Sequence, residues 1–424
     1  MSHPISACRI CGNATLEEVV SLGDQAFTGL FPRTATEPVP YGPLDLVKCS
    51  QEHGGCGLVQ LRHSFDPAQM YGATYGYRSG LNASMVRHLH RRVADARRRV
   101  PLAAGDVVLD IGSNDCTTLR AYGDEGYRLI GIDPSADKFR RFYPAWIEPV
   151  ADFFSAETYR SRMGNARAKI ITSIAMFYDL EDPTDFMRQI RDVLADDGIW
   201  VFEQSYLPLM IERNAYDTIC HEHVSYYALR QIEWMAERAG LKVVDVELND
   251  VNGGSFCITA AKAESRIPVN QWLVDAVAER EERLGYAGRA VYERFRERVF
   301  AHRRELREFV ADAQAAGRRV CGYGASTKGN VLLQFCGFTP ADIALVAEVN
   351  EDKFGCVTPH TRIPIASEAD VRRTAPDYLL VLPWHFRDNI VERERAWLEA
   401  GGQFVFPLPQ LEVVGGKAAT RRAA

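Results

Sequence analysis

Hydrophobic and polar positions alternate along the chain with two different periods, and these predict a succession of strands and helices. Short apolar runs open VVLDIGSNDC at Val107 and recur in AKIITSIAM and GIWVFEQS, which predicts buried strands. DFMRQIRDVLADDG and LRQIEWMAERAGL instead carry apolar residues at helical spacing. Strands that alternate with helices are typical of a parallel sheet covered on both faces, so the centre of the chain is predicted to be α/β.

Two further helices are predicted to frame this region. Residues 84–99, SMVRHLHRRVADARRR, place apolar side chains on an Arg-rich background, as an amphipathic helix does. Residues 272–316 contain no proline and only two glycines, which predicts a long charged connector. After it, RRVCGYGASTKGNVLLQF repeats the pattern of strand, glycine turn and helix, and PDYLLVLPWHF predicts one more strand. The chain is therefore predicted to contain two Rossmann-type units, which begin near Val107 and Val320.

The N-terminal region follows neither pattern. It consists of short extended segments broken by glycine and proline, so its core is too small to fold without a disulfide, a bound metal or a similar crosslink. Together with the two Rossmann-type units, this predicts three domains, which comprise residues 1–70, 71–300 and 301–424. A chain of 424 residues is too long for one ordinary core, which agrees with this division.

Composition narrows the class of partner. The chain has 50 Lys and Arg against 56 Asp and Glu, which gives a net charge of −6. This balance attracts neither nucleic acid nor an anionic membrane, so we expect a small-molecule substrate. No apolar run reaches the roughly 20 residues that span a bilayer, and MSHPISACRICG lacks the apolar segment of a signal peptide. We therefore expect a cytoplasmic protein.

Four of the ten cysteines lie in the first 56 residues. Cys8 and Cys11 form a C-x-x-C pair, and Cys49 and Cys56 follow with His53 between them. In a cytosolic chain such a cluster favours metal over disulfides, and four thiolates suit tetrahedral zinc. Because six residues separate the second pair, His53 competes with Cys56 for the last ligand position. Four protein ligands leave no open position, so the zinc is predicted to be structural.

The first glycine turn, DIGSND, follows a strand and opens a helix. Gly112 lets a ligand approach the backbone, and Asp133 ends the next strand 21 residues later, where a carboxylate can bind the ribose hydroxyls of an adenosine. The further glycines that NAD needs for its pyrophosphate are missing, which favours S-adenosylmethionine. The predicted cofactor contacts are Asp110, Gly112, Asn114 and Asp133, with Asp152 and Phe153 at the adenine.

The second glycine turn predicts a phosphate cradle. Backbone N–H groups at a helix N-terminus, hydroxyls and a lysine suit a nucleoside diphosphate, although the spacing of a P-loop is absent. The cradle would comprise Gly322, Tyr323, Gly324, Ser326 and Lys328. Beyond the end of LLVLP, the side chains placed to close over the same ligand are Trp384, His385 and Arg387.

Residues 216–227, YDTICHEHVSYY, concentrate titratable side chains but lack the H-E-x-x-H spacing of zinc proteases. In order along the chain, the CxxC segment, the DIGSND turn, a YDTIxHEH segment and a GYGASxKGN unit resemble the sugar C-methyltransferases. The resemblance covers nearly all 424 residues. One departure is Cys116, which stands where this family usually has the last glycine of SNDG.

The resemblance implies methyl transfer from S-adenosylmethionine to C3 of a nucleotide-linked 4-keto-6-deoxyhexose. A carbon beside a ketone becomes nucleophilic only when its proton leaves, so a base must stand beside the methyl donor, and the enolate oxygen needs donors. The resemblance assigns the base to His223, with Glu222 to orient or polarise it. His221 is the weaker candidate, because alternate residues of an extended segment face the same way but only one can reach the proton.

Further contacts with the sugar follow from the same resemblance. Tyr75 and Tyr77, in MYGATYGYRSG, match substrate-facing tyrosines. Tyr178 follows a strand at a position where some members carry a histidine, and stands as an alternative donor. Asn252 and Ser255, in VNGGSF, are expected to line the site.

Three other functions were weighed. An NAD-dependent epimerase or reductase on a nucleotide sugar commonly has a Tyr-x-x-x-Lys dyad, and no tyrosine here is followed by lysine at that spacing. A zinc-containing module that methylates protein or RNA requires a basic face, which the net charge does not favour. An O- or N-methyltransferase on the same sugar nucleotide stays open, because it also uses a histidine base. The sequence leaves the nucleotide, the stereochemistry and the oligomeric state open.

Overall fold

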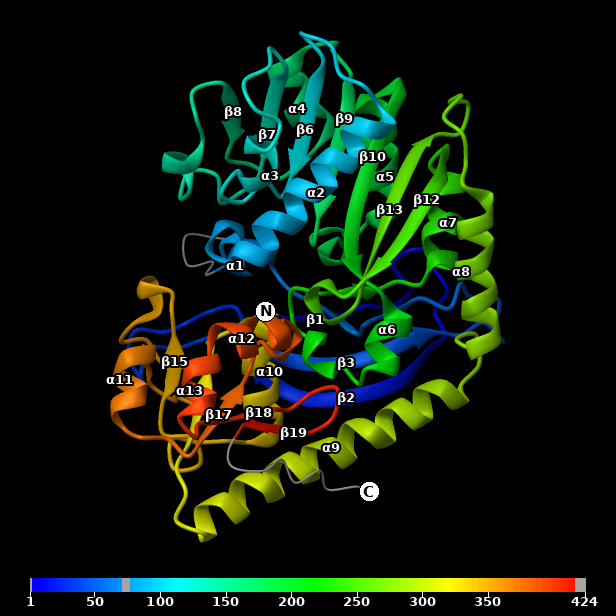
Figure 1. Ribbon diagram of the computed structural model, residues 1–424. Coiled ribbons are helices and arrows are strands. Elements are labelled where there is room, and N and C mark those ends of the chain that lie inside the picture. The colour runs from blue at the N-terminus through cyan, green and yellow to red at the C-terminus, as the bar shows by residue number, and fades with distance from the viewer. Residues whose placement is uncertain (1, 71–76, 416–424) are drawn as a thin grey trace.

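The computed structural model describes residues 2–70 and 77–415 (Figure 1). A seven-stranded sheet lies at its centre, and all neighbouring strands are parallel except at β13, which runs antiparallel to both neighbours. In spatial order its strands are β12 (Leu241–Asn249), β13 (Ser255–Lys262), β10 (Leu194–Ser205), β9 (Ala168–Ile174), β6 (Val107–Ile111), β7 (Arg128–Ile132) and β8 (Ile147–Val150).

Helices cover both faces of this sheet, so its central strands read as continuous apolar runs. Along β6, Leu109 packs in one core cluster and Val108 in another, because successive side chains point to opposite faces. The first face carries α4 (Ala156–Met163), α5 (Pro183–Val193) and α7 (Leu229–Arg238), and the second carries α2 (Ala83–Arg99) and α3 (Thr117–Arg120).

The order of the strands reverses between β6 and β9. From β6 the chain first builds outward through β7 and β8, and then returns to place β9 and β10 on the other side. In open α/β sheets, ligands bind at the carboxyl ends of the strands at such a reversal. This edge is therefore where a cofactor site is expected.

A second, six-stranded sheet forms the C-terminal part, and only β19 runs antiparallel in it. Its strands are β16 (Ile365–Ser367), β15 (Val346–Glu348), β14 (Val320–Tyr323), β17 (Tyr378–Val381), β18 (Gln403–Phe406) and β19 (Glu412–Gly415). Its helices are α10 (Thr327–Cys336), α11 (Glu368–Arg373), α12 (Arg387–Arg393) and α13 (Arg395–Glu399). The predicted second Rossmann-like unit is thus confirmed.

The N-terminal part forms an antiparallel sheet that borrows one strand from elsewhere in the chain. Its own strands are β2 (Leu16–Ala26), β3 (Tyr41–Cys49) and β4 (Val59–Leu61), beside a small pair of β1 (His3–Pro4) and β5 (His63–Ser64). The fourth strand is β11 (Ser225–Tyr226), which pairs with β4. The segment with the two histidines therefore runs directly into the N-terminal sheet.

The predicted connector is two helices, α8 (Gln271–Leu284) and α9 (Ala290–Ala315). Gly285 ends α8 with a φ of 75°, a left-handed conformation that glycine adopts readily. In Figure 1, α9 runs below β2 and the C-terminal sheet. Because α9 passes through residue 300, the predicted boundary between the second and third domains falls inside a helix.

Two remaining short helices are α1 (Pro67–Met70) and α6 (Leu207–Glu212). Across residues 2–70 and 77–415, no helix has both the length and the apolarity required to cross a bilayer.

Candidate functional site

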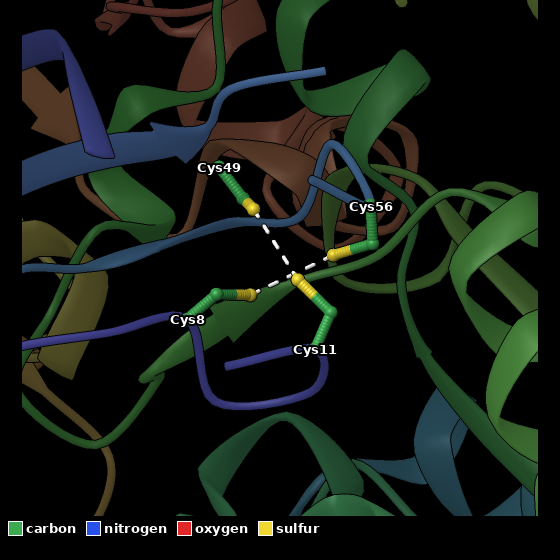
Figure 2. Close-up of side chains that lie close together, drawn as sticks. All are labelled: Cys8, Cys11, Cys49 and Cys56. Atoms are coloured by element: carbon green, nitrogen blue, oxygen red, sulfur yellow. Dashed lines mark hydrogen bonds between the residues drawn. The ribbon is translucent and has the colours of Figure 1, made fainter. Parts of the chain in front are cut away.

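The four N-terminal cysteines converge on one point (Figure 2). Their sulfur atoms all lie within 4.8 Å of one another, and the Sγ–Sγ distance is 3.6 Å for Cys8 and Cys56 and 3.5 Å for Cys11 and Cys49. Four sulfurs around a tetrahedral zinc, each about 2.3 Å from the metal, are about 3.8 Å apart. The cluster therefore fits a structural zinc ion, as predicted.

His53 is not part of this cluster. Its exposed ring lies 3.0 Å from the Ser50 hydroxyl through Nδ1, and Cys56 completes the ligand set instead. Hydrogen bonds with Cys49 and then Cys8 raise the pKa of Cys56 well above its ordinary value. Four thiolates are thus not stable together without a cation, and a zinc ion supplies that charge.

A cavity of about 300 Å³ lies at the carboxyl ends of β6, β7 and β9. Five predicted cofactor residues line it: Asp110, Gly112, Asn114, Asp133 and Phe153. The sixth, Asp152, does not, because its side chain is exposed and its carboxylate accepts a hydrogen bond from the Phe153 N–H. The cavity has the position, and the acidic and amide groups, that an adenosine with a methionine chain requires.

The two aspartates of the cavity differ in environment. Burial raises the pKa of Asp110 to about 7, although its carboxylate accepts a hydrogen bond from the Thr172 hydroxyl. Asp133 instead accepts hydrogen bonds from the backbone N–H groups of Asn114 and Ser135 at 2.8 and 2.6 Å. Asp133 therefore shapes the glycine turn as well as facing the ligand.

The turn after β6 also holds a segment of chain over the cavity, which sequence reasoning missed. The Asn114 amide oxygen accepts from the Ser79 N–H, and the Asp115 carboxylate accepts from the Gly80 N–H. Beside them Tyr77 lines the cavity with 46% of its surface exposed. Tyr75 lies outside the described residues.

Cys116 has a backbone conformation that glycine adopts readily. Its φ is 66°, in the left-handed region, and its side chain is fully buried in the apolar cluster below the turn. The thiol therefore points away from the cavity.

His223 does not line the cavity itself, but its ring packs against Tyr178, whose neighbour Asp179 does, and the orientation of the ring is fixed. Its Nδ1 atom donates to the carbonyl of Thr218 at 2.8 Å, which leaves Nε2 as the proton acceptor. The ring lies against Tyr178, with the ring centres 4.1 Å apart. Burial, reinforced by the nearby charge of Lys328, lowers the pKa of His223 to about 3, so the imidazole is neutral.

The expected roles of Glu222 and His221 need correction. A turn closed by the hydrogen bond from the His223 N–H to the Cys220 carbonyl sends the three side chains in different directions. His221 packs between Phe27 and Phe65 in the N-terminal core, so it is a buried structural residue. Thr218, not Glu222, orients His223.

Glu222 is held by the N-terminal loop instead. Its carboxylate is 3.5 Å from the Thr28 hydroxyl, and a Cβ atom at Gly29 would lie 2.4 Å from its Oε1. Burial raises the pKa of Glu222, so the carboxyl group favours its neutral form.

Lys328, on the first turn of α10, reaches the same region. Its Nζ donates to the backbone carbonyl of Asn252 at 2.5 Å, and Asn252 itself lines the cavity. Trp384 is buried nearby and donates from Nε1 to the Asp217 carboxylate at 2.7 Å. Sequence reasoning did not single out Asp217, although it lies within the quoted YDTICHEH segment.

The C-terminal glycine turn is not the predicted phosphate cradle, because protein groups occupy its backbone. The N–H groups of Gly322 and Gly324 bond to the neighbouring strand, and the N–H of Ala325 donates to the Glu348 carboxylate at 2.8 Å. The Tyr323 hydroxyl donates to Glu394. These three N–H groups therefore have protein acceptors and are not free to bind the phosphates of a nucleoside diphosphate.

The other residues that were predicted to bind the substrate have protein partners of their own. Ser326 caps α10 by accepting from the Gly329 N–H, and Ser255 donates to the Val251 carbonyl. Arg387 lies away from the site, since it forms an ion pair with Glu412.

One more group in the cavity was missed. Glu203, near the end of β10, lines the cavity and lies 2.6 Å from Nε2 of His88 on α2. The signal was a carboxylate near the end of the predicted strand GIWVFEQS.

Comparison with known proteins agrees with this geometry. Family models match the chain in three places: a zinc binding domain over residues 8–71, a methyltransferase domain over residues 85–246, and a C-methyltransferase C-terminal domain over residues 250–409. The chain is 33% identical over 420 residues to C-methyltransferase NovU of Streptomyces niveus, which is 98% of each protein.

Similar solved structures include the CcbJ methyltransferase of Streptomyces caelestis, at 16% identity and a TM-score of 0.32 over 45% of this chain and 92% of that one. Another is a toxoflavin-pathway N1-methyltransferase of Burkholderia thailandensis, at 15% identity and a TM-score of 0.33 over 44% and 83%. Both scores are too low to support an argument. The similarity to NovU, which runs through all three parts of the chain, places the protein in the C-methyltransferase family, as an enzyme that uses S-adenosylmethionine.

Proposed function

We propose that the enzyme transfers a methyl group to C3 of a nucleotide-linked 4-keto-6-deoxyhexose, through an enolate that His223 generates. The observation that carries the proposal is the neutral, oriented imidazole of His223, which packs against Tyr178, the neighbour of the cavity residue Asp179. A C-methyltransferase needs a base that removes a proton from carbon, and such a base must be unprotonated and fixed in direction.

The proton would move from C3 to Nε2 of His223. A pKa near 3 makes the free imidazole a weak base, but part of this depression comes from the charge of Lys328. An anionic diphosphate bound at Lys328 would offset that charge and raise the pKa of His223 toward its ordinary value. Substrate binding thus strengthens the base at the moment when it is needed.

The enolate oxygen would be stabilised by donors around the site. Burial raises the pKa of Glu222, which shifts the carboxyl group toward the neutral form that can donate a hydrogen bond. Tyr178, beside His223, and Tyr77, on the cavity wall, are further phenol donors. When bound, S-adenosylmethionine supplies an electrophilic methyl group: the bond from C3 to carbon forms as the sulfur–carbon bond breaks.

The nucleotide would lie toward the C-terminal part. Lys328 offers a cation, Asn252 connects the lysine to the cavity, and Trp384 and Ser326 border the same region. In this proposal residues 1–70 hold zinc, 71–300 bind the methyl donor, and 301–424 bind the nucleotide.

The test is solvent exchange at C3. The enzyme is incubated in deuterated water with nucleotide-linked 4-keto-6-deoxyhexoses and S-adenosylhomocysteine, and deuterium uptake is followed by NMR. We expect uptake that is lost in His223→Ala and retained in His90→Ala, which changes an exposed histidine of α2. Adding S-adenosylmethionine to the wild type should then add one methyl to carbon.

Two results would contradict the proposal. Methylation of the sugar nucleotide without exchange at C3 would assign the attack to oxygen or nitrogen. Exchange that persists in His223→Ala would place the base elsewhere.

A further inference from the structure

We propose that Asp217 is a positioning residue that joins the histidine segment to the C-terminal part: its buried carboxylate orients Trp384 and supplies the counter-charge for Lys328. The inference rests on the proposed function, because it takes Lys328 as the group that meets the anionic nucleotide. It concerns how that cation is held.

The carboxylate of Asp217 is placed to act in two directions. Asp217 is 0% exposed, and its Oδ2 accepts a hydrogen bond from Trp384 Nε1 at 2.7 Å. Within the described part of the chain, no hydrogen-bond donor reaches its Oδ1 atom. A buried carboxylate with one unpaired oxygen is unfavourable unless a positive charge lies near it, and Lys328 is that charge.

Lys328 is surrounded by groups that respond to its charge. Burial lowers the pKa of Lys328, and the carboxylate of Asp217 and then the Cys220 thiol act in the opposite direction. On the other sides stand His223 and His385, and the charge of Lys328 adds to burial in lowering the pKa of each. Of these four groups only Asp217 carries a carboxyl group; burial raises its pKa and the charge of Lys328 acts against this effect, so Asp217 and Lys328 each favour the charged form of the other.

Contacts join Lys328 to Asp217 through Asn252, Gly253 and Trp384. Lys328 bonds to the carbonyl of Asn252, and the next residue, Gly253, lies so close to Trp384 that a Cβ atom would be 3.1 Å from the indole. Trp384 in turn bonds to Asp217. Because Asp217 lies only six positions before His223, these contacts tie the segment that carries His223 to Lys328.

Asp217→Asn separates charge from hydrogen bonding, because the amide oxygen still accepts from Trp384. The readout is the Kd of deoxythymidine, guanosine or cytidine diphosphate, whichever binds most tightly, measured by calorimetry from pH 6 to 10. In the wild type, affinity should fall at alkaline pH as Lys328 loses its proton. In Asp217→Asn this fall should move to lower pH by about one unit, so that at a pH where the wild-type affinity is already falling the Kd should rise by up to about tenfold.

Two variants act as controls. Lys328→Arg keeps its charge at high pH, so the alkaline loss of affinity should disappear. Asp245→Asn removes another buried carboxylate, which bonds to Arg99 and Asn270 far from Lys328 along the chain, and should leave the profile unchanged.

An unchanged alkaline profile in Asp217→Asn would overturn the inference and leave Asp217 a purely structural residue. An alkaline loss that persists in Lys328→Arg, or no binding of any diphosphate, would overturn it too. Because the readout is binding, it is separate from the proposed chemistry: a failure of C3 exchange in the wild type would contradict the proposed function alone.

Discussion

Two histidines two positions apart serve opposite purposes, because a turn separates their side chains. His221 is enclosed by aromatic rings and its Nε2 donates to the Gly42 carbonyl, whereas His223 packs against Tyr178 of the central part. Burial lowers the pKa of His221 to about 4, so the folded protein holds it neutral while the unfolded chain binds a proton near pH 6.5. Acid therefore favours the unfolded state between these two values.

The resulting prediction concerns stability against pH. Between pH 6.5 and 4.5, His221 alone should lower the free energy of unfolding by about 2 kcal/mol, because a lowered histidine pKa gives stability that is lost as pH falls. In His221→Gln this contribution should vanish, so the variant loses less stability on acidification than the wild type. Urea denaturation at several pH values measures the difference, with His90→Ala as the control. Equal slopes for variant and wild type would contradict the assignment.

At the scale of elements, the position of Glu222 depends on close contact between the loop after β2 and the histidine segment. The loop after β2 brings Gly29 against the Glu222 carboxylate, where no side chain fits. This loop belongs to the N-terminal part, so that part contacts Glu222 of the histidine segment as well as forming the cysteine cluster.

Gly29→Ala should therefore displace Glu222 and lower kcat between about tenfold and a hundredfold, since a shift of about 1 Å at a reacting group has effects of that size. Zinc content and the affinity for S-adenosylhomocysteine should stay as in the wild type. Gly288→Ala, at an exposed glycine between α8 and α9, is the matched control. Wild-type kcat in Gly29→Ala would show that Glu222 does not need its present position.

Patterns local in sequence predicted much of this structure, and contacts between distant segments account for what they missed. The C-x-x-C pair and the DIGSND turn are motifs of only a few residues, so the zinc cluster and part of the cavity wall could be predicted from the sequence. The C-terminal glycine turn looked open because Glu348, which fills it, comes from another strand. Asp217 was passed over because its partner Trp384 is distant in sequence.

At the scale of the whole molecule, all three parts meet around the segment from residue 216 to 226. The N-terminal sheet takes in β11, the central part places Tyr178 against His223, and the C-terminal part contributes Lys328. The cysteine cluster joins the loop before β2 to the end of β3 and the start of β4. Metal binding therefore supports the very strand on which β11 pairs.

Removal of zinc should therefore destabilise the pairing of β11 with β4. Treatment with a chelator, or Cys56→Ser, should lower the thermal midpoint by roughly 5 °C or more and increase amide hydrogen exchange at Leu61, whose N–H donates to the Val224 carbonyl, and at Tyr226. Cys257→Ser, which changes a buried cysteine of β13, should lose stability without losing metal. Unchanged exchange at β11 in the metal-free protein would show that the strand pairing does not depend on zinc.

The pairing of β4 with β11 also bears on how the protein is made. During synthesis on the ribosome, β4 emerges early, but its partner at Ser225 follows only after most of the central sheet has been translated. Until then the N-terminal sheet presents an unpaired edge, the kind of surface that invites wrong partners and chaperone binding. An N-terminal fragment expressed alone would keep that open edge permanently, so the metal-binding part reaches its finished form only together with the catalytic segment.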